Sequence, residues 1–215
     1  MALNENVVRE QNDKLSAWVR TPTFVVVAGS LPGLFAATSL ENGLAIGVVT
    51  AVAIIAAAVL AHVVRFFTGM FSHMASLLML SATVVTLMGF AVRVIDPVVY
   101  EALGMYLPLS CINAIAVLYF LTDDGFTAAP AKGPLGTAFF AAATACVTLT
   151  FIGFMNGMFT TGQVFGLTMG ELAAAPIAIF GKPAGSLLLL ALVAAFVQSI
   201  EQIAARDAAA KGGER

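Results

Sequence analysis

The chain has 215 residues, of which 60% are hydrophobic and only 10% are charged, and its formal net charge is −2. A soluble domain carries about 25% charged residues, so polar side chains are too few here to cover a globule in water, and lipid must be the main solvent. Without a basic block, the sequence does not predict nucleic-acid binding. The two cysteines, Cys111 and Cys146, lie in apolar stretches, which argues against a disulfide framework.

Six apolar segments are long enough, or nearly so, to cross a bilayer. A helix needs about 20 residues to cross about 30 Å of hydrocarbon, and the alternating polarity of a barrel strand is absent. The six predicted spans are Pro22–Leu40, Gly43–Val64, Met74–Val92, Val98–Thr122, Leu135–Phe159 and Ile177–Ile203. We therefore predict an all-α integral membrane domain over residues 22–206, between an N-terminal segment at 1–21 and a tail at 207–215.

The positions of the basic residues predict the orientation of these spans. If the N-terminus is cytoplasmic, all basic residues except Arg93 and Lys182 fall in cytoplasmic segments, as the positive-inside rule requires. Residues 1–21 lack a basic region followed by a short apolar core, so they do not resemble a cleavable signal peptide. We predict a multi-pass protein of a bacterial or archaeal cytoplasmic membrane, with both termini in the cytoplasm.

The first and fourth spans are both interrupted by glycine and proline. Because three spans precede it, the second half of the chain enters the membrane from the opposite side. The first and fourth spans are then related by symmetry. Gly29 and Pro32 interrupt the first, and Gly104, Pro108 and Asn113 mark the break in the fourth. Matched interruptions of this kind indicate two inverted three-helix repeats with a site near the membrane midplane. Transmembrane helices also tolerate such residues without any site, and this alternative stays open.

Three stretches resemble one family of membrane subunits. The stretch "GSLPGLFAATSLENGLAIG" (29–47) resembles the first-span motif of the D and E subunits of the sodium-pumping NADH:quinone oxidoreductase (Nqr) and of the A and E subunits of the Rnf complex. "LGMYLPLSCINAIAVL" (103–118) is similar to their fourth-span motif, and "GKPAGSLLLLALVAAF" (181–196) to the start of their last span. The resemblance covers about residues 21–206, and the predicted cytoplasmic N-terminus favours the Nqr D and Rnf E branch.

The resemblance implies a function in electron transport. It implies a membrane subunit of a complex that couples ferredoxin or NADH oxidation to Na⁺ or H⁺ transport, and that is not catalytic alone. The implied partners are a homologous six-helix subunit and subunits that carry flavin and iron–sulfur groups. The implied cofactor is a [2Fe-2S] cluster shared with the homologous subunit, each of the two giving two cysteine thiolates. Four ligands, normally cysteines, hold such a cluster.

This chain departs from the family at both cluster positions, which are occupied by Leu31 and Ala114. Cys111 is a candidate replacement, but it lies one helical turn, about 5.4 Å, from Ala114 and supplies one thiolate; alternatively it is a small buried hydrophobe. The family's Arg-Glu pair late in the fifth span is also replaced, by Asn156 and Gly157. The cofactor is therefore either a shared cluster or none.

Loss of the ligands keeps other functions open. Ser110 and Asn113 can satisfy backbone groups that Pro108 frees, a structural role that needs no cofactor. A stand-alone inverted-repeat transporter or channel is the main alternative, and an assembly protein with no transport path is another. The coupling ion, the electron donor and the electron acceptor are not determined by the sequence.

Overall fold

The protein is helical throughout most of its described length. The computed structural model describes residues 22–64, 70–121, 134–164, 167–168 and 178–212. These residues form seven α-helices: α2 (Pro22–Ser30), α3 (Leu40–Val64), α4 (Met70–Ile95), α5 (Pro97–Leu103), α6 (Tyr106–Leu121), α7 (Pro134–Thr161) and α8 (Pro183–Gly212). The predicted N-terminal segment at 1–21 lies outside the described residues, as do Thr122 and Ile177 at the predicted ends of two spans.

A minimal hairpin departs from the predicted all-α fold. Its two-residue strands, β2 (Gln163–Val164) and β3 (Leu167–Thr168), pair antiparallel directly after α7. A 3-10 turn, Ala178–Gly181, precedes α8. The helix α8 continues to Gly212, through the predicted boundary at residue 206.

Three helices of the described chain are long and apolar enough to cross a membrane: Leu40–Ala61 within α3, Ala75–Ile95 within α4 and Ala138–Thr160 within α7. The apolar part of α8, Ala184–Ile200, is 17 residues long, slightly short of the usual 20. The first and fourth predicted spans are instead divided into shorter pieces. The protein is therefore a multi-pass membrane protein in which unbroken and broken helices are combined.

The first span breaks after Ser30, where α2 ends and residues 31–36 form turns. The last carbonyls of α2 are partly satisfied locally, because the Leu31 N–H donates to Val27 at 3.2 Å and the Leu34 N–H donates to Ser30 at 3.0 Å. Pro32 has no N–H to continue a helical ladder. The "GSLPG" stretch therefore ends a half-helix.

The fourth span breaks at Gly104, and not at Pro108 or Asn113. Gly104 has φ 44° and ψ −122°, a conformation that favours glycine because it has no Cβ. Pro108 lies in the first turn of α6, where its missing N–H costs no intrahelical hydrogen bond. Asn113 lies within the continuous helix that follows. The identification of Pro108 and Asn113 as break residues is corrected accordingly.

The helices α3 and α7 make the closest crossing in the fold. A Cβ on Gly153 would lie 2.5 Å from the Ser39 carbonyl and 2.8 Å from the Gly43 Cα, and a Cβ on Gly43 would lie 2.7 Å from the Leu149 carbonyl. One turn further along α3, a Cβ on Gly47 would lie 3.0 Å from a carbonyl of α7. Small residues four apart allow backbones in lipid to approach this closely.

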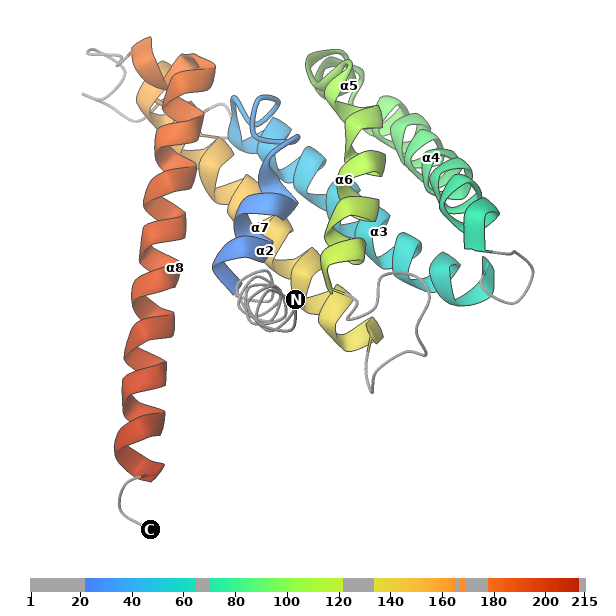
Figure 1. Cartoon of the computed structure of the whole chain (residues 1–215). Helices are drawn as coiled ribbons and strands as arrows, with labels where there is room; N and C mark the ends of the chain where they lie inside the picture. Colours follow the sequence, from blue (N-terminus) through green and yellow to red (C-terminus); the bar gives the residue numbers. More distant parts are fainter. Residues whose placement is uncertain (1–21, 65–69, 122–133, 165–166, 169–177, 213–215) are drawn as a thin grey trace, which may run out of the picture.

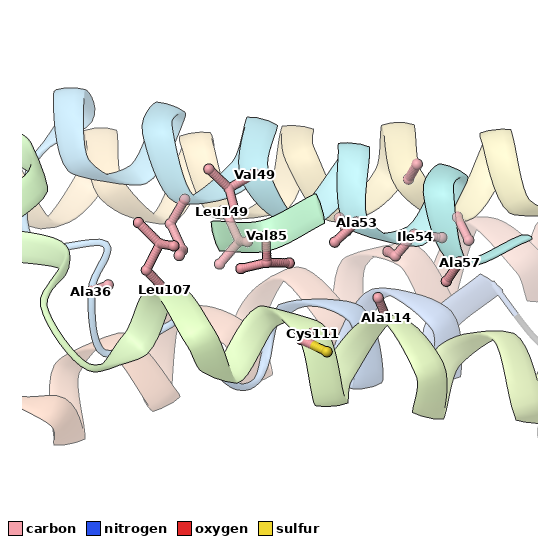
Figure 2. Close-up of a cluster of buried hydrophobic side chains, with 14 of the residues drawn as sticks. Ala36, Val49, Ala53, Ile54, Ala57, Val85, Leu107, Cys111, Ala114 and Leu149 are labelled. Atoms are coloured by element: carbon pink, nitrogen blue, oxygen red, sulfur yellow. The ribbon is translucent and has the colours of Figure 1, made fainter. Parts of the chain in front are cut away.

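The other helices pack around this central pair. The helix α4 contacts α3 and α6, while α8 contacts α2 and α7, and Figure 1 shows α4 and α8 on opposite sides of the bundle. The main core lies among α3, α4, α6 and α7, and Figure 2 shows Ile54, Val85, Leu107 and Leu149 pointing into it. Lipid is as apolar as these side chains, so the core is stabilised by close packing and not by exclusion of water.

We expect Gly153→Ala to destabilise the protein by about 1–3 kcal/mol, because the added Cβ overpacks a backbone contact. Thermal unfolding of the purified protein in mild detergent measures the effect. Gly136→Ala is the matched control on the same helix, because a Cβ there has no neighbour within 4 Å. That variant should be unchanged or slightly more stable, since alanine favours helix over glycine. Equal melting temperatures for the two variants would contradict the proposed role of the crossing.

Candidate functional site

The two broken spans meet at one buried hydrogen bond. The Asn113 side chain on α6 donates from Nδ2 to the Gly29 carbonyl near the end of α2, at 2.7 Å. The last carbonyls of a helix have no partner within it, and in lipid such a group is costly. Asn113 therefore closes the end of the half-helix from a distant part of the sequence. The sequence analysis assigned it to groups freed by Pro108, so its actual partner was missed.

The two positions at which the resemblance implies cluster ligands flank this hydrogen bond. Leu31 lies two residues after Gly29, and Ala114 directly follows Asn113. Leu31 is 42% exposed and Ala114 is 0% exposed. The fold thus brings the segments that carry both positions together, although neither side chain has an atom that binds a metal.

The cysteines of the chain lie elsewhere. Cys111 is buried one turn before Ala114 on α6 (Figure 2), and its thiol contacts the Leu78 carbonyl of α4 at 3.6 Å. Cys146 lies on α7, beside the α3 backbone at Gly47. Among the described residues, no three His, Cys, Asp or Glu side chains gather closely enough to hold a metal ion. The donor set of this chain therefore does not fit an iron–sulfur cluster, which needs thiolates that converge on one point.

A second polar junction joins the broken first span to α7 and α8. Asn156 on α7 is fully buried, and its Nδ2 donates to the Ala37 carbonyl and to the Ser186 hydroxyl, both at 2.8 Å. Ala37 lies in the segment between α2 and α3, and Ser186 lies in the first turn of α8. The sequence analysis noted Asn156 only as a replacement for a charged residue. A lone carboxamide in an apolar helix was the signal that it would bond to other segments.

A third contact links α3 to α6. The Thr50 hydroxyl donates to the Ser110 hydroxyl at 3.3 Å, and both residues are buried. Ser110 therefore bonds to another helix and not to the backbone around Pro108. Together the three polar contacts hold the broken spans against the central helices without a charged group.

Comparison with known proteins identifies the family. A family model described as "Rnf-Nqr subunit, membrane protein" matches residues 14–194. The chain belongs to the Rnf-Nqr family of membrane subunits. The match includes both broken spans and the two junctions described above.

Three characterised relatives are similar over most of their length. The chain is 28% identical over 177 residues to the E subunit of the Na⁺-translocating ferredoxin:NAD⁺ oxidoreductase complex of Acetobacterium woodii, covering 80% of this chain and 87% of the relative. It is 26% identical over 200 residues to the E subunit of the ion-translocating oxidoreductase complex of Methanosarcina acetivorans, covering 89% of each. It is 25% identical over 185 residues to the E subunit of the proton-translocating ferredoxin:NAD⁺ oxidoreductase complex of Clostridium ljungdahlii, covering 84% of each.

We expect Asn113→Ala to destabilise the protein by about 1–3 kcal/mol, because it leaves the buried Gly29 carbonyl without a partner. Thermal unfolding in detergent is the measurement. Asn42→Ala is the control, because the Asn42 side chain bonds only to the Thr38 side chain, at an exposed position. Its effect should stay within about 0.5 kcal/mol. If Asn113→Ala lowers the stability no more than Asn42→Ala does, the hydrogen bond between Asn113 and Gly29 does not stabilise the fold.

Proposed function

We propose that this chain is the E component of an Rnf-type complex, in which ferredoxin oxidation and NAD⁺ reduction are coupled to ion translocation. Family membership supports this proposal, and so do the names of the three relatives. The relatives are named for Na⁺, for protons and for an unspecified ion, so the proposal does not assign the ion. The family match over residues 14–194 carries the proposal, and the Asn113–Gly29 hydrogen bond supports it by joining the two segments in which the resemblance implies cluster ligands.

The proposal includes two inverted three-helix repeats with both termini in the cytoplasm. The helix contacts support it, because α3 packs on α6 as α7 packs on α2, and α4 packs on α6 as α8 packs on α2. The helices α3 and α7 face each other at the centre, as elements beside a twofold axis do. In this arrangement α2 and α5–α6 are the equivalent broken spans.

We further propose that the chain supplies no thiolate to a cluster. Leu31 and Ala114 cannot ligate iron, and Cys111 contacts α4, away from the junction. A homologous partner that contributed two thiolates would provide only half of the four that a cluster needs. The chain would therefore keep the scaffold of an electron-transfer protein and act through packing and conformation, while electrons pass through other groups of the complex.

Anaerobic purification of the tagged chain in mild detergent, followed by mass spectrometry of what accompanies it, tests the assignment. We expect a homologous six-helix subunit together with flavin and iron–sulfur subunits. Recovery of the folded chain alone, or as a homo-oligomer, would contradict the assignment. That result would favour a stand-alone transporter or channel, which the loss of both ligand residues also permits.

Replacement of the cysteines tests the proposal about the cluster. We expect Cys111→Ala to leave the iron content of the purified complex and its electron-transfer rate unchanged, because the thiol is directed at the Leu78 carbonyl of α4 and not at a cluster. Cys146→Ala is the matched control, since its thiol lies on a different helix. A decrease in bound iron in the Cys111 variant alone would overturn the proposal and identify Cys111 as a ligand.

A further inference from the structure

A groove opens on the outer surface of the helices, and its floor includes Val85, Leu107 and Cys111 of the main core. It lies between α4 and the α5–α6 break and has a volume of about 170 Å³. An engineered protein cavity of about 150 Å³ holds benzene, so the groove has room for several carbon atoms. Its lining is mainly apolar and includes Val85, Phe90 and Leu107. The groove is therefore suited to an apolar chain.

Small residues keep this groove open. Ala82 and Gly89 line it on α4, and Gly104 lines it at the break between α5 and α6. A Cβ on Gly89 would meet the Leu107 side chain at 3.2 Å, so a larger residue there would push against Leu107 in the wall of the groove. Outside the groove, α4 exposes large apolar side chains such as Leu87 and Val94, so this surface of the protein faces lipid.

The groove leads to a positive charge. Ala82, Thr86, Gly89 and Arg93 are spaced by four, three and four residues, so they lie on one face of α4. The Arg93 guanidinium lies 5.8 Å from the centre of the Tyr100 ring, which also lines the groove. Arg93 is exposed, so it is available to an anion at this end of the groove.

The nearest acidic residue in the sequence is already engaged. Asp96 accepts hydrogen bonds from the N–H groups of Val98 and Val99, at 2.9 and 3.2 Å, and so caps α5. Glu101 is exposed on α5, one helical turn beyond the capping residue Asp96. Arg93 does not line the groove, but its guanidinium lies over Tyr100, which does, and so is the basic group beside one end of the groove.

We propose that this groove binds one acyl chain of an anionic phospholipid whose phosphate pairs with Arg93. From Ala82 to Arg93 the helix rises by about 16 Å at 1.5 Å per residue, which is about half of a 30 Å hydrocarbon core and so matches one leaflet. Arg93 lies close to the end of the apolar span at Ile95, the depth at which a phosphate lies. Basic side chains between transmembrane helices bind acidic headgroups at the cytoplasmic surface, and Arg93, which the predicted orientation places at the opposite surface, can pair with a phosphate there in the same way. The inference does not depend on the proposed role in electron transport.

Native mass spectrometry of the full-length protein tests this proposal. The protein is purified in mild detergent and mixed with equal amounts of phosphatidylglycerol and phosphatidylcholine that carry the same acyl chains. We expect the wild type to retain phosphatidylglycerol preferentially. Arg93→Gln should lower that retention about fivefold, the factor for about 1 kcal/mol per basic residue near the surface. Arg206→Gln, at an exposed position of α8, is the matched charge control. This variant should retain as much phosphatidylglycerol as the wild type.

A second variant tests the apolar part of the site. Ala82→Phe places a ring in the groove from an exposed position, so folding is preserved, and both lipids should be lost from this site. The proposal is overturned if the wild type shows no preference, or if the Arg93 and Arg206 variants lose equal amounts of lipid. It is also overturned if Ala82→Phe keeps its lipid but no longer purifies with a membrane partner, because the groove would then be a helix–helix interface.

Discussion

The close crossing of α3 and α7 is the contact on which the other helices depend. At Gly43 and Gly153 the two backbones are too close for any side chain. In lipid there is no hydrophobic effect to hold helices together, so stability comes from packing and from hydrogen bonds between helices. With this pair fixed, α2 and α6 each pack on one central helix, and α4 and α8 each pack on one broken span. We expect a larger residue at the crossing to push α3 and α7 apart and so to displace the helices that pack on them.

The broken spans create a second requirement, because a helix that ends within the membrane leaves carbonyls that lipid cannot satisfy. The protein meets it with neutral side chains from distant segments. Asn113 reaches the end of α2, and Asn156 reaches the turn that follows and the start of α8. A carboxamide forms such bonds without the cost of burying a charge. These bonds join the segments around Leu31 and Ala114, the positions at which the resemblance implies cluster ligands.

At the candidate site the helix arrangement and the residues that could bind a metal must be considered separately. The segments that meet at the Asn113–Gly29 bond are those that hold metal ligands in the pattern this chain resembles, yet Leu31 and Ala114 cannot bind iron. Cys111, the thiol nearest in sequence, faces α4. In the role that we propose, the chain fixes the positions of neighbouring helices in a complex and presents a surface that faces lipid. The groove beside Arg93 is part of that surface.

The sequence by itself determined the solvent, the helical class, the family and the two interrupted spans, because hydropathy, glycine, proline and motif residues act locally. It also placed Leu31 and Ala114 at the positions where the resemblance implies cysteine ligands. The tertiary structure alone decided where the fourth span breaks, since the positive φ at Gly104, and not Pro108, ends α5. It also decided the partners of Asn113, Asn156 and Ser110. These partners lie 84, 119 and 60 residues away along the chain for the bonds to Gly29, Ala37 and Thr50, and local sequence carries no signal for a contact that only packing creates.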